Sequence, residues 1–91
     1  MVRLDAARPN PAPGTTSVPF SIPREARVAC RVYDLGGRMV RALVDAELPA
    51  GPHALQWDGR DGRGQAQPAG VYLIRLEALG EQRSSRLLLL R

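Results

Sequence analysis

Apolar and polar side chains alternate along this chain in short runs, and this alternation constrains the fold more than any other feature. Successive side chains of a β-strand point to opposite faces of a sheet, so an alternating run predicts a strand with one buried face. Val18, Phe20 and Ile22 share a face in the first long run. Pro19 lies among them and has no N–H to donate, so this strand is expected at a sheet edge or paired on one side only. No stretch of about ten residues shows a helical period. Alternating runs cover residues 15–23, 26–34, 52–57 and 70–79. Residues 38–44 are apolar on both faces apart from Arg41 and are expected to return the chain as a further strand, and residues 83–91 form the last expected strand.

Turn-forming residues separate these runs. Gly36 and Gly37 are typical of a tight hairpin. Pro49 and Gly51 mark residues 45–51 as a loop, and residues 79–82 return the chain into its last run. Short strands with turn signals every ~8–12 residues are typical of sandwiches. The sequence therefore predicts an all-β fold, an antiparallel β-sandwich of about six or seven short strands.

The residue types in the runs predict which side chains form the core. Trp57 is the only tryptophan and the largest single anchor available. Cys30 alternates with Val28 and Val32, so we interpret it as a small core residue, the alternative being a reactive thiol. His53 is the only histidine and has no second ligand at metal-binding spacing. It is interpreted as a rim residue and not as a metal ligand or general base.

Charge and composition exclude several classes of protein. Thirteen basic residues give a formal net charge of +4, and all of them are arginines. They are scattered among acids and apolar residues, which favours a solvated surface over a nucleic-acid-binding face. A single cysteine excludes an intramolecular disulfide. No apolar run approaches the ~18 residues of a membrane span, so no membrane insertion is expected. Residues 1–14 lack the apolar stretch of a signal peptide, so we expect any export signal on a longer parent chain.

Residues 58–64 hold two acids, two arginines and three glycines, and they allow three interpretations. A calcium loop needs oxygen ligands at alternate positions and a distal glutamate, whereas Asp58 and Asp61 are three apart with arginines beside them. A phosphate cradle needs a helix after its glycines, whereas a proline and a strand-like run follow Gly64. The favoured interpretation is a long connection in which both aspartates accept backbone hydrogen bonds and glycines take positive φ angles.

The sequence offers no constellation for catalysis. A nucleophile needs a base nearby, and the single cysteine and single histidine lie on different runs with no motif around either. The acids of the pairs 45/47 and 58/61 fall in predicted turns beside arginines, whereas paired catalytic carboxylates need a cleft that raises one pKa. We therefore predict a protein that is not an enzyme, with no catalytic residue, no cofactor and no metal ligand.

Four segments together resemble one family. "WDGRDGRGQAQPAGVYLIRL" resembles the Trp-Asp-Gly-x-Asp-x-x-Gly…Gly-Val-Tyr-x-x-Arg-Leu segment of the FlgD-type immunoglobulin-like domain, named after the flagellar hook-capping protein. The related C-terminal sorting domains of type IX secretion substrates share it. "RPNPAPGTTSVPFSIP" is similar to the opening of those domains, "VYDLGGRMVRALVDAELPAGPHALQWDG" to their middle and "RLLLLR" to their closing apolar run. The resemblance covers about residues 8–91, with the motifs in the family's order.

The resemblance implies an immunoglobulin-like sandwich over residues 9–91, with residues 1–8 as the remnant of an N-terminal linker. One position departs from the family pattern: Ala12 stands where the opening motif usually has phenylalanine. If that aromatic side chain plugs the sandwich in relatives, this chain has lost the plug. The family's structural motif maps onto Trp57, Asp58, Gly59, Asp61, Gly64, Gly70 and Tyr72.

The resemblance also implies a non-catalytic role at the end of a larger secreted bacterial protein. We expect a sorting and surface-targeting module that is secreted or held at the cell surface, monomeric, with no nucleic-acid partner. Its expected partners are the secretion machinery and the parent polypeptide N-terminal to the domain. The chain stops directly after its last run, and that terminal strand offers a handle for strand addition by a receptor. The alternatives are a structural spacer or flagellar-type assembly domain that contacts an assembly protein, and a free-standing β-protein that binds through a sheet edge. The recognition strand consists of Arg86, Leu87, Leu88, Leu89, Leu90 and Arg91.

Overall fold

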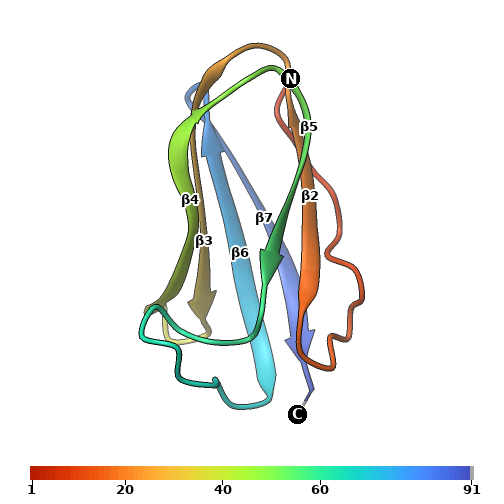
Figure 1. Ribbon diagram of the computed structural model, residues 1–91, viewed down its shortest axis with the longest axis vertical. Helices are drawn as coiled ribbons and strands as arrows, with labels where there is room; N and C mark the ends of the chain where they lie inside the picture. Colours follow the sequence, from red (N-terminus) through yellow and green to blue (C-terminus); the bar gives the residue numbers. More distant parts are fainter. Residues whose placement is uncertain (91) are drawn as a thin grey trace.

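The computed structural model describes residues 1–90 and shows seven β-strands in two antiparallel sheets (Figure 1). The strands are β1 (Arg3–Leu4), β2 (Thr16–Ile22), β3 (Ala26–Asp34), β4 (Met39–Leu48), β5 (Gly51–Trp57), β6 (Gly70–Ala78) and β7 (Glu81–Leu89). One sheet has the order β1-β2-β5 and the other the order β4-β3-β6-β7. This architecture confirms the predicted all-β, immunoglobulin-like sandwich. Within residues 1–90 no helix has the length and apolar character needed to cross a bilayer.

The alternating pattern explains the core between the two sheets. Val18, Phe20 and Ile22 of β2 are buried, as predicted, and Trp57 of β5 is fully buried beside them. Burial of one such side chain stabilises the fold by about 1.5–3 kcal/mol relative to its exposure. The four-stranded sheet closes the core from the other side with Val28, Cys30, Val32, Ile74, Leu76, Leu87 and Leu89.

Cys30 is a core residue, as interpreted from its neighbours. Its side chain has no exposed surface. Burial raises the pKa of the Cys30 thiol from 9.0 to about 12, and this effect exceeds the opposing effect of the nearby Arg31 charge. The thiolate is the reactive form of cysteine, so this side chain is chemically inert in the folded protein.

The position of Pro19 in the sheet differs from the one expected from the sequence. β2 is the middle strand of its sheet, so the prediction that it lies at an edge or pairs on one side only is wrong. β2 pairs with β5 along its whole length and with β1 only at Phe20 and Ser21. The Pro19 carbonyl accepts the N–H of Asp5 at 3.0 Å, so the missing N–H also belongs to the side of β1. The proline therefore shortens the pairing with β1 and leaves the ladder to β5 intact.

β4 is longer than its apolar pattern indicated. The predicted loop over residues 45–51 is wrong, because the strand continues through Asp45 to Leu48 and pairs there with β3. Only residues 49 and 50 connect β4 to β5. Two register shifts interrupt the pairing of β3 with β4, between Cys30 and Arg31 and between Val32 and Tyr33. A bulge turns successive side chains of one strand out of strict alternation, which explains why β4 lacked a clean two-residue period.

The N-terminal residues belong to the domain, which corrects the predicted linker over residues 1–8. Val2 and Ala7 are buried in the core. Arg3 and Leu4 form β1 and pair with Ser21 and Phe20. The sequence suggested a linker because this pairing involves only two residues and leaves no alternating run. Figure 1 shows the segment running beside β2 toward the lower end of the sandwich.

The connections important for the family motif gather at one end of the sandwich. The β3–β4 turn and the long β5–β6 connection lie together at the lower end in Figure 1, where β7 also finishes. The predicted glycine hairpin is confirmed: the N–H of Gly37 donates to the Asp34 carbonyl at 3.0 Å, and Gly37 has a φ of 86°. A positive φ favours glycine because a side chain would be strained there.

Candidate functional site

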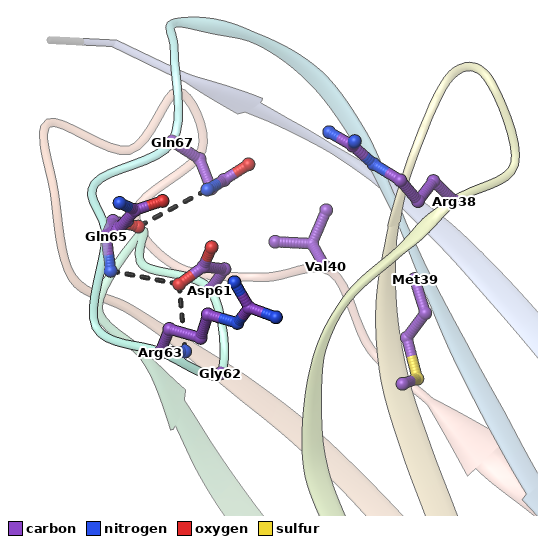
Figure 2. A pocket seen from close by; sticks show the side chains of 8 residues that line it. All are labelled: Arg38, Met39, Val40, Asp61, Gly62, Arg63, Gln65 and Gln67. Carbon is purple, nitrogen blue, oxygen red and sulfur yellow. Dashed lines mark hydrogen bonds between the residues drawn. The ribbon is translucent and has the colours of Figure 1, made fainter.

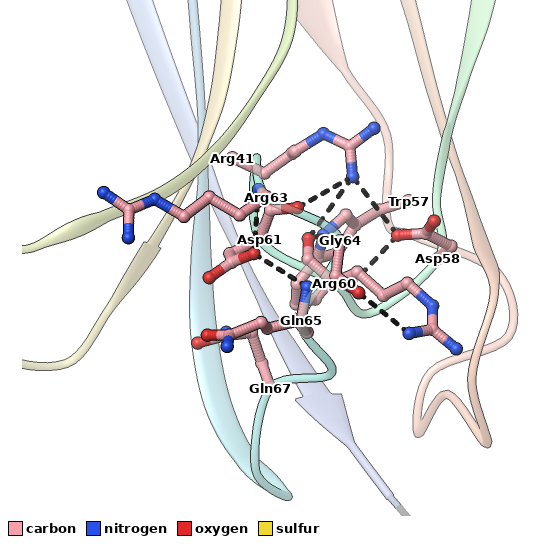
Figure 3. Close-up of polar contacts among 9 residues, drawn as sticks. All are labelled: Arg41, Trp57, Asp58, Arg60, Asp61, Arg63, Gly64, Gln65 and Gln67. Carbon is pink, nitrogen blue, oxygen red and sulfur yellow. Dashed lines mark hydrogen bonds and ion pairs between the residues drawn. The ribbon is translucent and has the colours of Figure 1, made fainter.

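The β5–β6 connection, residues 58–69, is organised by its two aspartates (Figure 3). Asp58 Oδ1 accepts the backbone N–H of Arg60 at 3.0 Å. Asp61 Oδ1 accepts the N–H groups of Arg63 and Gln65, each at 2.9 Å. A carboxylate close to N–H donors is favoured in its charged form, and these bonds, that to Gln65 first, lower the pKa of Asp61 below 3.8. Both aspartates therefore accept backbone N–H groups inside the loop, in the manner predicted for a long connection.

The loop is attached to the core by two aromatic residues. Trp57 Nε1 donates to the Arg60 carbonyl at 2.9 Å, so the buried indole N–H has a partner. Tyr72, at the start of β6, donates its hydroxyl to the Pro68 carbonyl at 2.6 Å. The two rings meet edge to face, with 5.2 Å between their centroids. Trp57 and Tyr72 thus hold both ends of the loop against the sandwich.

Arg41 connects the same loop to β4. Its Nη1 lies 3.4 Å from Asp58 Oδ1 and from the carbonyl oxygens of Arg60 and Asp61. The N–H of Gly62 donates to the Val40 carbonyl at 3.2 Å. Through these contacts the Arg41 guanidinium and the Val40 carbonyl hold the loop against β4. Gly59 and Gly64 have φ angles of 76° and 86°, as the favoured interpretation expected of glycines in this loop.

An open hollow of about 540 Å³ lies between this loop and the β3–β4 turn. Figure 2 shows Val40 between the loop side chains and Arg38. The lining is mixed in charge, with the acid Asp61 and the arginines Arg38 and Arg63. Among the described residues no three His, Cys, Asp or Glu side chains gather at metal-binding distance. The hollow brings no nucleophile to a base.

The only histidine lies away from this loop. His53 is half-buried on β5, and its ring stacks on Phe20 with 5.2 Å between centroids. Its Nε2 lies 2.8 Å from the Pro49 carbonyl, to which it donates. The structure thus places His53 at the rim of the three-stranded sheet, in the position interpreted from its sequence context.

The terminal strand divides its leucines between two faces. Leu87 and Leu89 have no exposed surface, while Leu88 is 38% and Leu90 45% exposed. Arg86 is exposed. Arg91, the last residue of the predicted recognition strand, lies outside the described residues. Two leucines therefore belong to the core, and two remain accessible to a partner.

The edge of this strand is already occupied. Residues 10–12 lie along β7, where Ala12 forms an isolated parallel bridge with Leu89. The N–H of Ala12 donates to the Leu88 carbonyl at 2.8 Å, and the N–H of Leu90 donates to the Ala12 carbonyl at 2.7 Å. The expected handle for strand addition is therefore covered by the protein itself over Leu88–Leu90. A strand edge protected in this way resists unwanted pairing.

Asn10 completes the cover, and the sequence reasoning did not identify it. Its Nδ2 donates to the Arg86 carbonyl and its Oδ1 accepts the N–H of Leu88, each at 3.0 Å. The side-chain amide therefore substitutes for one strand residue. The sequence signal for this role was the position of Asn10 in the Pro-Asn-Pro motif, where an amide side chain lies between two prolines. Ala12 is fully buried, so this position does plug the sandwich, with a methyl group instead of an aromatic ring.

Comparison with known proteins agrees with this geometry. The family model described as the FlgD Ig-like domain matches residues 10–82. The chain is 36% identical over 67 residues to the basal-body rod modification protein FlgD of Salmonella typhimurium. That match covers 70% of this chain and 29% of the relative, so the chain spans less than a third of that protein.

Two solved structures have a similar fold. Dimeric latent PorU from Porphyromonas gingivalis superposes with a TM-score of 0.79 at 20% identity, over 99% of this chain and 9% of that one. PorZ, described as an essential surface component of the type IX secretion system of the same organism, gives a TM-score of 0.61 at 19% identity. That match covers 94% of this chain and 11% of PorZ. In both proteins the similar region is a small part of a long polypeptide.

Proposed function

The chain belongs to the FlgD Ig-like domain family, and from this premise we propose that it is a sorting and surface-targeting module of a larger exported protein. The family supports a non-catalytic protein-interaction domain. The sorting role is supported by the residue pattern shared with type IX sorting domains and by the long polypeptides in which the fold occurs. Its proposed location is the cell surface or the extracellular space.

One observation carries the sorting proposal: Leu88 in β7 and Leu90 directly after it present exposed apolar side chains. Leu88 and Leu90 are accessible, while Leu87 and Leu89 fix the same strand in the core. Residues 10–12 occupy the strand edge. A receptor would therefore recognise the leucine side chains of the intact sandwich, without adding a strand. Contiguous exposed apolar patches rimmed by polar residues are typical of interaction sites.

The experiment is an export assay in a host with type IX machinery. The domain is fused behind a signal peptide and a fluorescent reporter, and Leu88 and Leu90 are both replaced by serine. Deleting the terminal residues is avoided, because it would also remove the core side chains of Leu87 and Leu89. Leu35→Ser is the matched control, since Leu35 is 68% exposed in the β3–β4 turn. Thermal unfolding of each purified domain establishes that the variants fold.

The expected result is reporter outside the cell for the native domain and for Leu35→Ser. The double variant should retain its reporter in the periplasm. Equal release by the folded double variant would contradict recognition at Leu88 and Leu90. Periplasmic retention of the native domain itself would contradict the sorting role.

The alternative is an assembly domain of the flagellar type. It is favoured by the 36% identity to FlgD, a basal-body rod modification protein. Under this alternative the domain contacts another assembly protein and exports no passenger. Complementation separates the two roles: grafted into FlgD in place of the native immunoglobulin-like region, an assembly domain restores motility and a sorting module does not.

A further inference from the structure

The outer face of the four-stranded sheet brings two arginines into direct opposition. Arg31 on β3 pairs with Arg75 on β6 in the sheet register. Cys30 and Ile74, their neighbours along the strands, face the core, so both arginines point outward. Like charges directly opposite each other destabilise a sheet. The Arg31–Arg75 pair is therefore expected to lower the stability of the sheet at this position.

The two arginines are neutralised differently. Arg31 Nη1 lies 3.3 Å from Glu77 Oε1, and its Nη2 lies 4.0 Å from Asp45 Oδ2. Arg75 has no carboxylate partner within residues 1–90. Its Cζ lies 4.8 Å from the centroid of the Tyr33 ring. Stacking on an aromatic ring orders a guanidinium and leaves its N–H edge available to a carboxylate.

Apolar side chains surround this unpaired cation. Leu73 lies opposite Tyr33 on the same face, and Val71 lies opposite Leu88 one step further along the strands. Leu73, Val71 and Tyr33 are half-buried, and Leu88 is exposed. Arg86 on β7 lies opposite Leu73, and in the described part of the chain its side chain has no ion-pair partner. The face thus carries an apolar strip flanked by two arginines without acids.

We propose that this outer face, formed by Tyr33, Val71, Leu73, Arg75, Arg86 and Leu88, binds a protein segment in which carboxylates alternate with apolar side chains. The nearby acids of this face already bind Arg27 and Arg31, which leaves Arg75 and Arg86 without a carboxylate among the described residues. Charge complementarity therefore favours an acidic partner. The apolar strip favours a peptide over a nucleic acid, because a phosphate backbone needs cations in a row and gains nothing from valine and leucine. This surface shares Leu88 with the proposed sorting site, but its binding is centred on Arg75 and does not require the sorting role.

The test uses the purified chain and a short synthetic peptide in which glutamates alternate with valines. Binding is followed by fluorescence anisotropy of the labelled peptide and by backbone amide shifts of the protein in NMR spectra. We expect shifts at residues 31–33, 71–75 and 86–88. A peptide with lysines in place of the glutamates should not bind. Added salt should weaken the binding of the acidic peptide, because it screens the attraction between charges.

Arg75→Glu is the decisive variant, and Arg24→Glu is its matched control. Both change the net charge equally, but Arg24 is exposed in the β2–β3 connection at the other end of the sandwich (Figure 1). Arg75→Glu should weaken binding by about tenfold or more, because reversal replaces an attraction with a repulsion. Arg24→Glu should have little effect. Circular dichroism and thermal unfolding verify that Arg75→Glu folds, which the outward position of the side chain favours.

Several results would overturn the proposal. Equal weakening by both variants would show an effect of net charge alone. Amide shifts confined to other strands would place the site elsewhere. Tighter binding to phosphatidylglycerol vesicles or to single-stranded DNA than to the acidic peptide, with the same loss in Arg75→Glu, would assign the face to a different class of partner.

Discussion

The side-chain amide of Asn10 is bonded to the backbone of Leu88, 78 residues away in the chain, with 3.0 Å between Oδ1 and the Leu88 nitrogen. A second bond joins the same amide to the Arg86 carbonyl. Through these bonds the first residues of the domain close the edge of its last strand. The N-terminal segment is thus part of the surface that a receptor for the terminal strand would meet.

Asn10→Ala should lower the free energy of unfolding by about 1–2 kcal/mol, because two hydrogen bonds across the sheet edge are lost. The freed N–H of Leu88 should also exchange faster with solvent. Urea unfolding and native-state hydrogen exchange measure the two effects. Gln56→Ala is a matched control, since Gln56 is an exposed amide on β5. Unchanged exchange at Leu88 in Asn10→Ala would show that the edge does not depend on this side chain.

Tyr72→Phe should destabilise the protein by about 1 kcal/mol, since it removes the hydroxyl bond to the Pro68 carbonyl and keeps the ring. Tyr33→Phe is the comparison, because the Tyr33 ring lies on the outer face beneath Arg75. Chemical unfolding of both variants measures the difference. If the two substitutions cost the same, the bond to Pro68 adds nothing to the attachment of the loop.

Asp61→Asn should change how stability depends on pH. The folded protein lowers the pKa of Asp61 below 3.8, so its contribution to stability is fully present above that pH. As the pH falls through the lowered pKa, the carboxylate is protonated and the contribution is lost. The variant should therefore be less stable than the native chain at neutral pH, and the difference should shrink as the pH falls through the lowered pKa of Asp61. Urea midpoints recorded across this range provide the measurement, and a constant difference at all pH values would contradict the assignment.

Ser85 and Thr16 should respond in opposite ways to removal of the hydroxyl. Within the described residues, Ser85 Oγ is buried without a hydrogen-bond partner, whereas Thr16 Oγ1 donates to the Pro9 carbonyl at 2.8 Å. Ser85→Ala should leave stability unchanged or raise it by up to about 1 kcal/mol, because an unsatisfied buried hydroxyl is costly. Thr16→Val should lower it by about 1–2 kcal/mol. Thermal unfolding distinguishes the two, and a large loss in Ser85→Ala would mean that its hydroxyl has a partner in solution.

Local chemistry explains what could be predicted from the sequence. Strand faces follow from a two-residue alternation, so the buried side of β2 and of β3 was predicted correctly. Asp58 and Asp61 accept N–H groups within four residues of their own position, so their role could also be inferred. The long β4 was missed where bulges break the alternation. The family resemblance, with its motifs in the same order, made it possible to predict an immunoglobulin-like sandwich.

Short-range patterns thus determined the strands other than β1 and the end of β4, the core tryptophan, the hairpin glycines and the chemistry of the aspartate loop, because each depends on residues close together in the chain. The tertiary structure alone decided which strands are neighbours and in what register. Only that register places Arg31 opposite Arg75, brings Asn10 to Leu88 and makes Pro19 harmless in a middle strand. Such pairs are separated by long stretches of chain, and their energies depend on a sheet order that local alternation does not specify.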